Sequence, residues 1–278
     1  MHGKIVVVTG ATSGIGEVAA ETLARAGARI LFVARSEPKA RTLLSRLIRA
    51  NPDAAHDFVL ADLSALGEMK SAARALIAKA AKVDVLINNA GAIFDRRETT
   101  VDGLERTFAV NHMAYFVVTE LLRPILAPQA RIVSTASVAH AFARLDFDDL
   151  QTRAGYSAFG AYGRSKLCNI LWTRELADRL SSSDVTANCF HPGGVNTGFG
   201  DNAKGWLKPL MALGKRFMIT PAQGADTLIW LAASGDVDGR TGGYWSRRRL
   251  MTPSSAARDA AAAARLWRAS ADIAGLPA

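Results

Sequence analysis

The sequence predicts an α/β protein: one doubly wound domain with a central parallel sheet of about seven strands flanked by helices. Three observations predict it. Short, β-branched apolar runs recur along the chain, as in strands that are buried on both faces. Segments with helical spacing separate these runs, and such alternation builds βαβ units. The 278 residues, 49% of them hydrophobic, can bury a large core, and neither a linker nor an internal repeat interrupts them.

The first strand is expected at 4–9, and the helix that follows it, 14–27, ends at a glycine. Further strands are expected where the apolar runs recur, at 29–34, 57–62, 84–89, 131–137, 185–191 and 243–246. Helices are expected between them, at 37–51, 65–81, 103–127, 157–182, 221–234 and 254–273. The stretch 198–220 is weakly periodic, and we interpret it as an excursion from the sheet within a single domain, 1–278.

Charge and cysteine content limit the class of protein. The net charge is +9, but the basic residues are scattered and their densest run, Arg247–Arg249, is short, so we expect no nucleic-acid partner. No run of about 18 apolar residues marks a membrane-spanning helix. Cys168 and Cys189 lack metal-ligand spacing, so we predict no metal site. Two free thiols in predicted core elements fit a cytoplasmic protein.

A glycine-rich turn follows the first predicted strand. In TGATSGIG (9–16), Gly10, Gly14 and Gly16 lie between a buried strand and a helix. Such a turn lets a ligand phosphate approach the backbone N–H groups at the helix N-terminus. The spacing differs from the Gly-x-Gly-x-x-Gly of other dinucleotide-binding folds. We predict a dinucleotide site here; the alternative is a turn that is merely tight.

The end of the second predicted strand indicates which dinucleotide binds. A carboxylate there would bind the ribose 2′-hydroxyl, but the strand ends in Ala34 and Arg35, and the first acid is Glu37. A guanidinium suits a 2′-phosphate through charge-assisted hydrogen bonds, and Ser36 adds a hydroxyl donor. We therefore predict NADP(H) rather than NAD(H); the alternative is that Arg35 simply faces solvent.

Tyr162 and Lys166, in AYGRSKLCN (161–169), are four positions apart in a predicted helix and so share a face. An ammonium about 4 Å from a phenol contributes about 4 kcal/mol at an effective dielectric near 20. That is enough to lower the phenol pKa of about 10 by two to three units, as proton transfer near neutral pH requires. The alternative is an exposed pair on a solvated helix face.

The chain also resembles the short-chain dehydrogenases/reductases over nearly its whole length. Seven motifs of that family occur in order: TGATSGIG (9–16), ADL (61–63), NNAG (88–91), VNHMAYF (110–116), IVSTASVAH (132–140), YGRSK (162–166) and HPGGVNTG (191–198). The resemblance implies a Rossmann-type fold and hydride transfer between a nicotinamide cofactor and an alcohol or carbonyl. The residues then expected to contact NADP(H) are Gly10, Thr12, Ser13, Gly14, Ile15, Gly16, Arg35, Ser36, Asp62, Leu63, Asn89, Ala90, Gly91, Tyr162, Lys166, Pro192, Gly193, Val195 and Thr197.

The resemblance further implies catalytic roles. Tyr162 would exchange a proton with the substrate, Lys166 would lower the pKa of that tyrosine and bind the nicotinamide ribose, and Asn111 would hold a water behind Lys166. The serine that binds the substrate oxygen is assigned to Ser137, with Ser134 as the weaker candidate, because the motif reads Ser-Thr-Ala-Ser. A non-catalytic NADP(H)-binding sensor or scaffold is the rival class, and an intact catalytic set argues against it.

Within the family, the chain looks most like the branch of retinol dehydrogenases and the oxidoreductase domain of WW-domain proteins. Ser137 and Tyr162 are 25 residues apart, and that branch shares this long insertion. The apolar residues of 198–220 are expected to wall a pocket for a lipophilic substrate or to pack the excursion. We expect no N-terminal membrane segment like that of the animal retinol enzymes, and retinol itself is therefore a less expected substrate. Relatives often pair through helices, which implies a homodimer or homotetramer.

Overall fold

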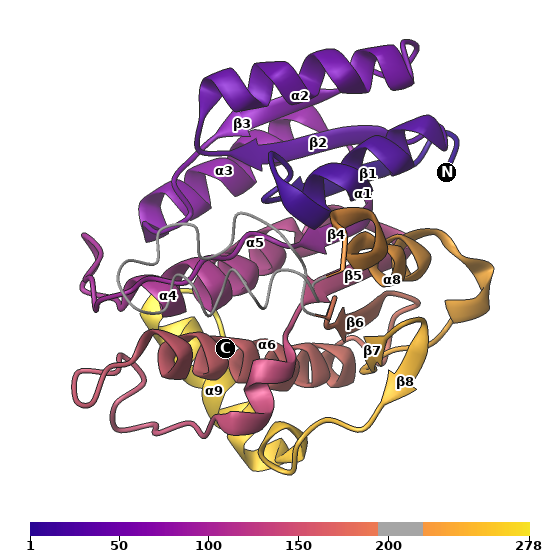
Figure 1. Cartoon of the computed structure of the whole chain (residues 1–278). Helices are drawn as coiled ribbons and strands as arrows, with labels where there is room; N and C mark the ends of the chain where they lie inside the picture. Colours follow the sequence, from indigo (N-terminus) through magenta and orange to yellow (C-terminus); the bar gives the residue numbers. More distant parts are fainter. Residues whose placement is uncertain (194–218) are drawn as a thin grey trace.

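Eight strands form one sheet, in the order β3-β2-β1-β4-β5-β6-β7-β8, in the computed structural model, which describes residues 1–193 and 219–278 (Figure 1). Neighbouring strands from β3 to β7 run parallel, and β8 pairs with β7 in the antiparallel sense. The strands are β1 (Ile5–Thr9), β2 (Arg29–Ala34), β3 (Asp57–Leu60), β4 (Val83–Asn88), β5 (Leu126–Thr135), β6 (Thr186–Phe190), β7 (Tyr244–Ser246) and β8 (Arg249–Met251).

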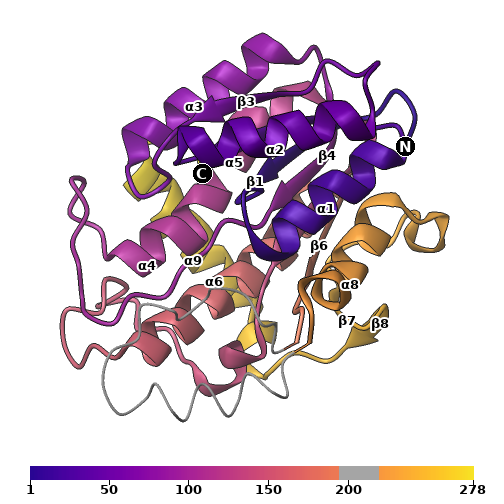
Figure 2. The same cartoon turned by 45° about the horizontal axis from the view of Figure 1, so that its top comes forward.

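Helices cover both faces of the sheet (Figure 2). Helices α1, α2 and α8 pack on one face, and α3, α5, α6 and α9 pack on the other. The helices are α1 (Gly14–Arg25), α2 (Glu37–Ala50), α3 (Leu66–Lys79), α4 (Arg106–Phe108), α5 (Ala114–Leu122), α6 (Ala158–Arg179), α8 (Pro221–Ala233) and α9 (Ala260–Ala274). A π-helical turn, Ala109–Met113, joins α4 to α5.

Successive residues of the central strands enter different cores because strand side chains alternate between faces. Val6 and Val8 of β1 pack toward α1 and α2, whereas Val7 between them packs toward α3 and α5. In β2, Ile30 and Leu31 divide in the same way. Both faces are therefore buried, which explains why these strands read as continuous apolar runs.

The predicted fold class is confirmed, and the differences are local. The helix predicted over 103–127 is instead built from α4, the π-helical turn, α5 and a 3₁₀ turn that ends at Ile125. Strand β5 then begins at Leu126, ahead of the predicted start at 131. The early part of β5 contains a proline and Gln129 at φ 61°, and both features are unusual for a strand.

The eighth strand was not predicted. It returns beside β7 through a two-residue turn in which Arg247 and Arg248 have φ values of 49° and 58°. Hairpin turns of this kind favour glycine or asparagine, so two arginines give no sequence signal for one. Of the excursion predicted at 198–220, residues 198–218 lie outside the described part of the chain.

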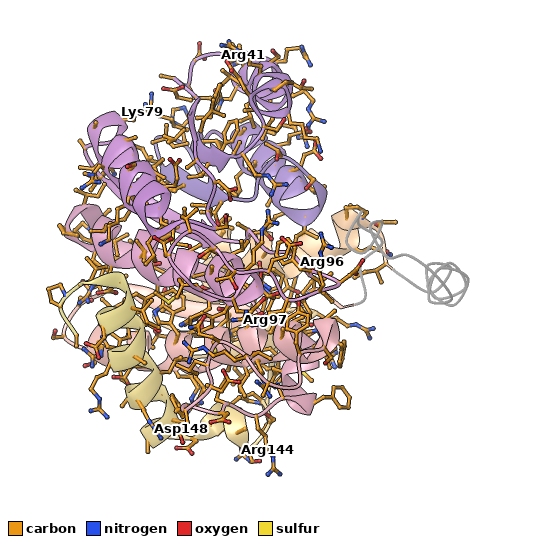
Figure 3. All side chains as sticks on the ribbon, turned by 90° about the vertical axis from the view of Figure 1, so that its left-hand side faces the viewer. Arg41, Lys79, Arg96, Arg97, Arg144 and Asp148 are labelled. Atoms are coloured by element: carbon orange, nitrogen blue, oxygen red, sulfur yellow. The ribbon has the colours of Figure 1, made fainter. Side chains whose placement is uncertain are left out.

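Basic side chains are spread over the surface of the described residues. Figure 3 shows Arg41 and Arg144 at opposite ends of the molecule, with Arg96 between them. Several of these side chains form ion pairs with nearby acids, as Arg41 does with Glu37. The net charge of +9 is therefore spread over the surface and not gathered in one patch. No helix within 1–193 and 219–278 is long and apolar enough to span a bilayer.

Candidate active site

The predicted site residues gather at the carboxyl edge of the sheet. Gly10 follows β1, Arg35 follows β2, Asp62 comes just after β3, Asn89 follows β4 and Ser137 comes just after β5. These five strands are neighbours, and the winding reverses between β1 and β4. Ligands of open α/β sheets bind at such a reversal, beyond the carboxyl ends of the strands.

The glycine turn packs too closely for other side chains. Gly10 has φ +67°, and a Cβ there would lie 2.7 Å from Ala90 Cα. A Cβ on Gly16 would lie 2.3 Å from the Gly10 carbonyl oxygen. The N-cap residue of α1, Ser13, makes no side-chain capping bond, so the first-turn N–H groups are available to an anion, and the turn fits a dinucleotide phosphate. Within the turn, Ser13 is exposed, Thr12 and Gly14 are half-buried, and Ile15 is buried.

Asn89 joins this turn to β5. Its Nδ2 donates to the Gly10 carbonyl at 3.0 Å, and its Oδ1 accepts from Thr135 Oγ1 at 3.1 Å. Thr9 Oγ1 accepts from the N–H groups of Asn89 and Ala90, at 3.0 and 3.1 Å. These bonds fix the glycine turn relative to the residues that follow β5.

The end of β2 is open to solvent. Arg35 is exposed, and within the described residues its side chain has no ion pair or hydrogen bond. Ser36 is the N-cap residue of α2, and its hydroxyl makes no capping bond. Asp62 and Leu63, two further predicted cofactor residues, follow β3. Asp62 Oδ1 accepts from the Ser64 N–H at 3.0 Å, and Leu63 is buried. A guanidinium without an acidic partner fits an anionic group of a ligand.

Tyr162 and Lys166 share a face of α6, as predicted from their spacing. The helix begins after Ser157, whose Oγ accepts from the Gly160 N–H at 3.1 Å, so Tyr162 lies near its start. The side chains of Tyr162 and Ser137 hydrogen-bond to each other. Lys166 Nζ lies 5.6 Å from the centroid of the Tyr162 ring.

The two serine candidates have different surroundings. Ser137 is half-buried beside Tyr162, and its Oγ accepts from the Ala139 N–H at 3.2 Å. Ser134 lies within β5 and is fully buried. A substrate oxygen can therefore approach Ser137, whereas Ser134 is enclosed by the sheet and its helices.

Lys166 is held inside the protein. The side chain is nearly fully buried, and Nζ donates to the Thr135 carbonyl at 2.9 Å. Asn169 Nδ2 donates to the same carbonyl at 3.3 Å. Gly91 lies against this cluster, because a Cβ there would be 3.5 Å from Lys166 Nζ and 3.4 Å from Asn111 Oδ1.

Burial disfavours the charged form of both members of the pair. It raises the pKa of Tyr162, and the hydrogen bond to Ser137 offsets this only in part. Burial also lowers the pKa of Lys166 to about 7. The lower tyrosine pKa expected from Lys166 therefore needs further positive charge beside the phenol, as an oxidised nicotinamide would provide.

The amide of Asn111 is used within the protein. Its Oδ1 accepts from the Ala92 N–H at 2.8 Å, and its Nδ2 donates to the Ala92 carbonyl at 2.9 Å and to Ser165 Oγ at 3.0 Å. The side chain thus holds the segment after β4 against α6. The water predicted behind Lys166 stays a prediction.

The last predicted cofactor residues follow β6. Pro192 is half-buried and Gly193 is exposed, with φ +88°. The Gly193 N–H donates to Nδ1 of the neighbouring His191 at 3.2 Å. Val195 and Thr197 lie outside the described residues.

The comparisons with known proteins agree with this arrangement. The family model described as short chain dehydrogenase matches residues 4–208. The chain belongs to this family. It is 42% identical over 277 residues to the proposed daunorubicin C-13 ketoreductase of Streptomyces sp. (strain C5). That alignment covers 99% of this chain and 94% of that protein. It is 39% identical over 277 residues to retinol dehydrogenase 12 of Mus musculus, covering 99% of this chain and 87% of that protein.

A solved structure with a bound cofactor is also similar. The blue fluorescent protein from a metagenomic library, in complex with NADPH, has a TM-score of 0.71 and 28% identity, over 88% of this chain and 96% of that one. As a member of the short chain dehydrogenase family, the protein is an oxidoreductase that acts on alcohol or carbonyl groups with a nicotinamide cofactor. The predicted likeness to the retinol dehydrogenase branch is confirmed.

Three residues at this candidate site were not predicted. Tyr115 is fully buried, and its ring centroid lies 5.6 Å from Lys166 Nζ. Asn169 shares the Thr135 carbonyl with Lys166, and His140 contacts Ser137. Spacing offered a weak signal for Tyr115 and Asn169, which lie four and three positions after predicted residues and hence on the same helix faces.

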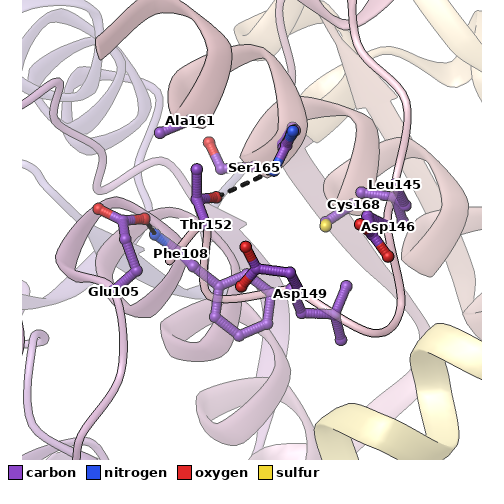
Figure 4. Close-up of a pocket in the computed structure, with 11 residues that line it drawn as sticks. Glu105, Phe108, Leu145, Asp146, Asp149, Thr152, Ala161, Ser165 and Cys168 are labelled. Carbon is purple, nitrogen blue, oxygen red and sulfur yellow. Dashed lines mark hydrogen bonds between the residues drawn. The ribbon is translucent and has the colours of Figure 1, made fainter. Parts of the chain in front are cut away.

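The acidic side chains of a small pocket beside the candidate site bind backbone N–H groups (Figure 4). Glu105 lies at its edge, where its carboxylate accepts from the N–H groups of Thr107 and Phe108. Asp149 accepts from the Arg153 and Ala154 N–H groups at 2.9 and 3.1 Å. The acids therefore cap backbone, and the described part of the chain holds no group of three His, Cys, Asp or Glu side chains placed to bind a metal.

Proposed function

We propose that the protein is an NADP(H)-dependent oxidoreductase that interconverts an alcohol and a carbonyl on a lipophilic substrate. Tyr162 acts as the proton donor and acceptor. The observation that carries the proposal is the meeting of Ser137, Tyr162 and the buried Lys166 at the sheet edge that also bears the glycine turn. A sensor or scaffold would have no use for that constellation.

The preference for NADP(H) rests on Arg35. Its guanidinium lies at the end of β2 without an acidic partner in the described residues, and Ser36 beside it has a hydroxyl unused in capping. The two would bind the 2′-phosphate, and the N–H groups at the start of α1 would bind the pyrophosphate. When bound, the cofactor gives or takes a hydride at C4 of its nicotinamide.

The chain's own residues supply the proton. In reduction, Tyr162 donates its hydroxyl proton to the carbonyl oxygen of the substrate as the carbonyl carbon accepts the hydride. Ser137 Oγ already accepts from the Ala139 N–H, so its own hydroxyl hydrogen can donate to the same substrate oxygen. Lys166 uses one N–H on the Thr135 carbonyl and keeps two for ribose hydroxyls. Oxidation of an alcohol reverses these transfers.

Exposed apolar side chains support a lipophilic substrate. Val138, next to Ser137, is 54% exposed, and Phe142 and Phe159 are 79% and 57% exposed. The two phenylalanine rings lie 6.2 Å apart, and Phe159 is three positions before Tyr162 on α6. The relatives named for retinol and for daunorubicin agree with a substrate of this class.

The test is NADPH-dependent reduction of a panel of aldehydes and ketones with apolar rings or chains, followed by NADPH absorbance. We expect turnover by the wild-type chain. In Tyr162→Phe, we expect a loss of about 10²- to 10⁴-fold in kcat, the usual contribution of a positioned proton donor, with NADPH binding retained. Equal turnover by Tyr162→Phe would refute the role of Tyr162. NADPH binding with no turnover across the panel would favour the sensor or scaffold.

A further inference from the structure

His140 contacts the proposed catalytic serine from inside the protein. It lies in the short 3₁₀ turn Val138–Phe142 and is only 3% exposed. Its Nδ1 lies 2.7 Å from the Ser137 carbonyl oxygen, and its Nε2 lies 3.2 Å from the backbone nitrogen of Ser254. The ring thus joins the segment after β5 to the segment after β8, 114 residues further along the chain.

These two contacts fix the tautomer of His140. The Ser254 N–H can only donate, so Nε2 of the ring must be the unprotonated acceptor. The proton of the neutral ring is then on Nδ1, which donates to the Ser137 carbonyl. Both ring nitrogens are used, and neither is available for other chemistry.

We propose that His140 is a positioning residue for the oxidoreductase reaction: in its neutral, Nδ1-protonated form, it holds the backbone of Ser137 so that the serine hydroxyl faces Tyr162. This inference rests on the function proposed above. His140 acts through Ser137 and touches neither substrate nor cofactor.

The other side of the same turn is fixed by helix α6. A Cβ on Gly163 would lie 2.9 Å from the Ala139 carbonyl oxygen, so the helix and the turn are in close contact. The Ala139 N–H in turn donates to Ser137 Oγ. Ser137 is therefore placed between α6 and His140, and loss of His140 frees one of its two sides.

Protonation of His140 would break this arrangement. An imidazolium carries N–H groups on both nitrogens, and its Nε2–H would then face the Ser254 N–H. Within the described residues, titratable groups near the ring include Tyr244 of β7, whose ring centroid lies 5.0 Å from that of His140, and His191, which follows β6. The charge of Arg247 contributes to lowering the pKa of His191. Burial lowers the pKa of His140 and so favours the neutral form.

Activity measurements compare wild type with His140→Leu and His140→Asn. Leucine fills the space without hydrogen bonds, whereas asparagine keeps a donor near the position of Nδ1. For His140→Leu, we expect kcat to fall by about 10- to 100-fold, as when a reacting group is displaced by about 1 Å, with NADPH affinity within about twofold of wild type. His140→Asn should recover part of this loss. Wild-type kcat should also fall at acid pH along a limb that His140→Leu lacks.

Each outcome decides a different point. If wild type reduces carbonyls faster than Tyr162→Phe and His140→Leu matches wild type, the proposed function stands and the positioning role is wrong. Equal losses of kcat and NADPH affinity in both His140 variants would indicate that His140 only stabilises the fold, and they would also overturn the positioning role. If wild type is no faster than Tyr162→Phe, the proposed function fails, and the tautomer must be tested without turnover.

Nitrogen-15 NMR of the histidine rings gives that independent test. His56 is an internal reference, because its Nδ1 accepts from the Ile30 N–H at 3.0 Å and its proton must be on Nε2. We expect His140, assigned by its absence in His140→Asn, to show the opposite tautomer, with the proton on Nδ1. A spectrum in which both histidines carry the proton on Nε2 would rule out the positioning role whatever the activity.

Discussion

The end of β2 and the surroundings of Lys166 are built in opposite ways, although both belong to one proposed site. Arg35 is exposed, and among the described residues its guanidinium has no hydrogen-bond or ion-pair partner. Lys166 is 2% exposed and lies among Thr135, Asn169 and two tyrosine rings. A residue that recognises an anion by charge can work alone at the surface. A residue that controls a proton has to be held at one distance from it.

This difference separates two kinds of effect. A substitution at the end of β2 should change cofactor affinity and leave stability alone. A substitution around Lys166 should change the rate, its pH dependence and the pH dependence of stability, because the lysine is buried among contacts that also control its pKa. The predictions that follow test this contrast.

Lys166→Met should have the largest effect. We expect kcat for carbonyl reduction to fall by about 10²- to 10⁴-fold, because the phenol of Tyr162 loses the ammonium beside it. Stability should not fall at neutral pH, since methionine fills the space and Asn169 still donates to the Thr135 carbonyl. Steady-state kinetics and thermal unfolding measure the two effects. A variant that retains kcat would show that the ammonium is not needed.

The same variant gives a pH signature. The pKa of Lys166 is about 7 in the folded chain, against 10.5 for an ordinary lysine. Between these values the unfolded chain binds more protons, so Lys166 makes the free energy of unfolding rise with pH. The difference in stability between wild type and Lys166→Met should therefore shift in favour of wild type from about pH 7 upward. A difference that is constant with pH would mean that the lysine titrates normally.

The contrast also explains what the sequence could predict. The positions of the glycine turn and of Arg35 were predictable because each depends on residues that are close together in the chain. The strands were predictable because both faces of the sheet are buried, which leaves continuous apolar runs. Tyr162 and Lys166 were predictable because one helix presents both.

Contacts between distant segments were not predictable. His140 meets Ser254 across 114 residues, and nothing in either segment indicates the other. The sequence indicates that Asn111 belongs to the site, but it cannot show that the amide is used by Ala92 and Ser165. It also cannot show that burial opposes the expected effect of Lys166 on the pKa of its neighbouring tyrosine, since burial depends on the whole fold.

Arg35→Ala should have the next largest effect, confined to the cofactor. We expect NADPH affinity to fall by about 10- to 100-fold, the value of hydrogen bonds to a charged group, and NADH affinity to stay unchanged. Stability should change by less than about 0.5 kcal/mol because the side chain is exposed. Fluorescence titration with both cofactors measures this. Equal affinity of wild type for NADH and NADPH would contradict the phosphate-binding role of Arg35.

Gly16→Ala would sharpen the comparison, because this part of the proposed cofactor site is packed rather than open. A Cβ there meets the Gly10 carbonyl at 2.3 Å and Asn89 Nδ2 at 2.4 Å. We expect a loss of about 1 to 3 kcal/mol in stability, typical of overpacking. Gly67→Ala is the matched control, since Gly67 is also helical and a Cβ there has no neighbour within 4 Å. Urea unfolding should show the control at or above wild type, and similar curves for both variants would refute the packing argument.

Tyr115 should give the smallest effect. Its ring and that of Tyr162 each have their centroid 5.6 Å from Lys166 Nζ, so the ammonium lies near two aromatic faces. Such contacts favour the charged amine by about 0.5 to 2 kcal/mol, or roughly 0.4 to 1.5 pH units. In Tyr115→Leu, the pKa of Lys166 should therefore fall further, and the loss of kcat with rising pH should begin at lower pH by that amount.

Tyr115→Phe separates the ring from the hydroxyl. It keeps the aromatic face toward Lys166, so its alkaline limb should coincide with that of wild type. The pH profile of kcat, measured for all three chains at saturating NADPH, decides the matter. If phenylalanine and leucine shift the limb equally, the hydroxyl rather than the ring supports Lys166. If neither shifts it, the ammonium is fixed by the Thr135 carbonyl alone, and the surroundings of Lys166 are less interdependent than their burial suggests.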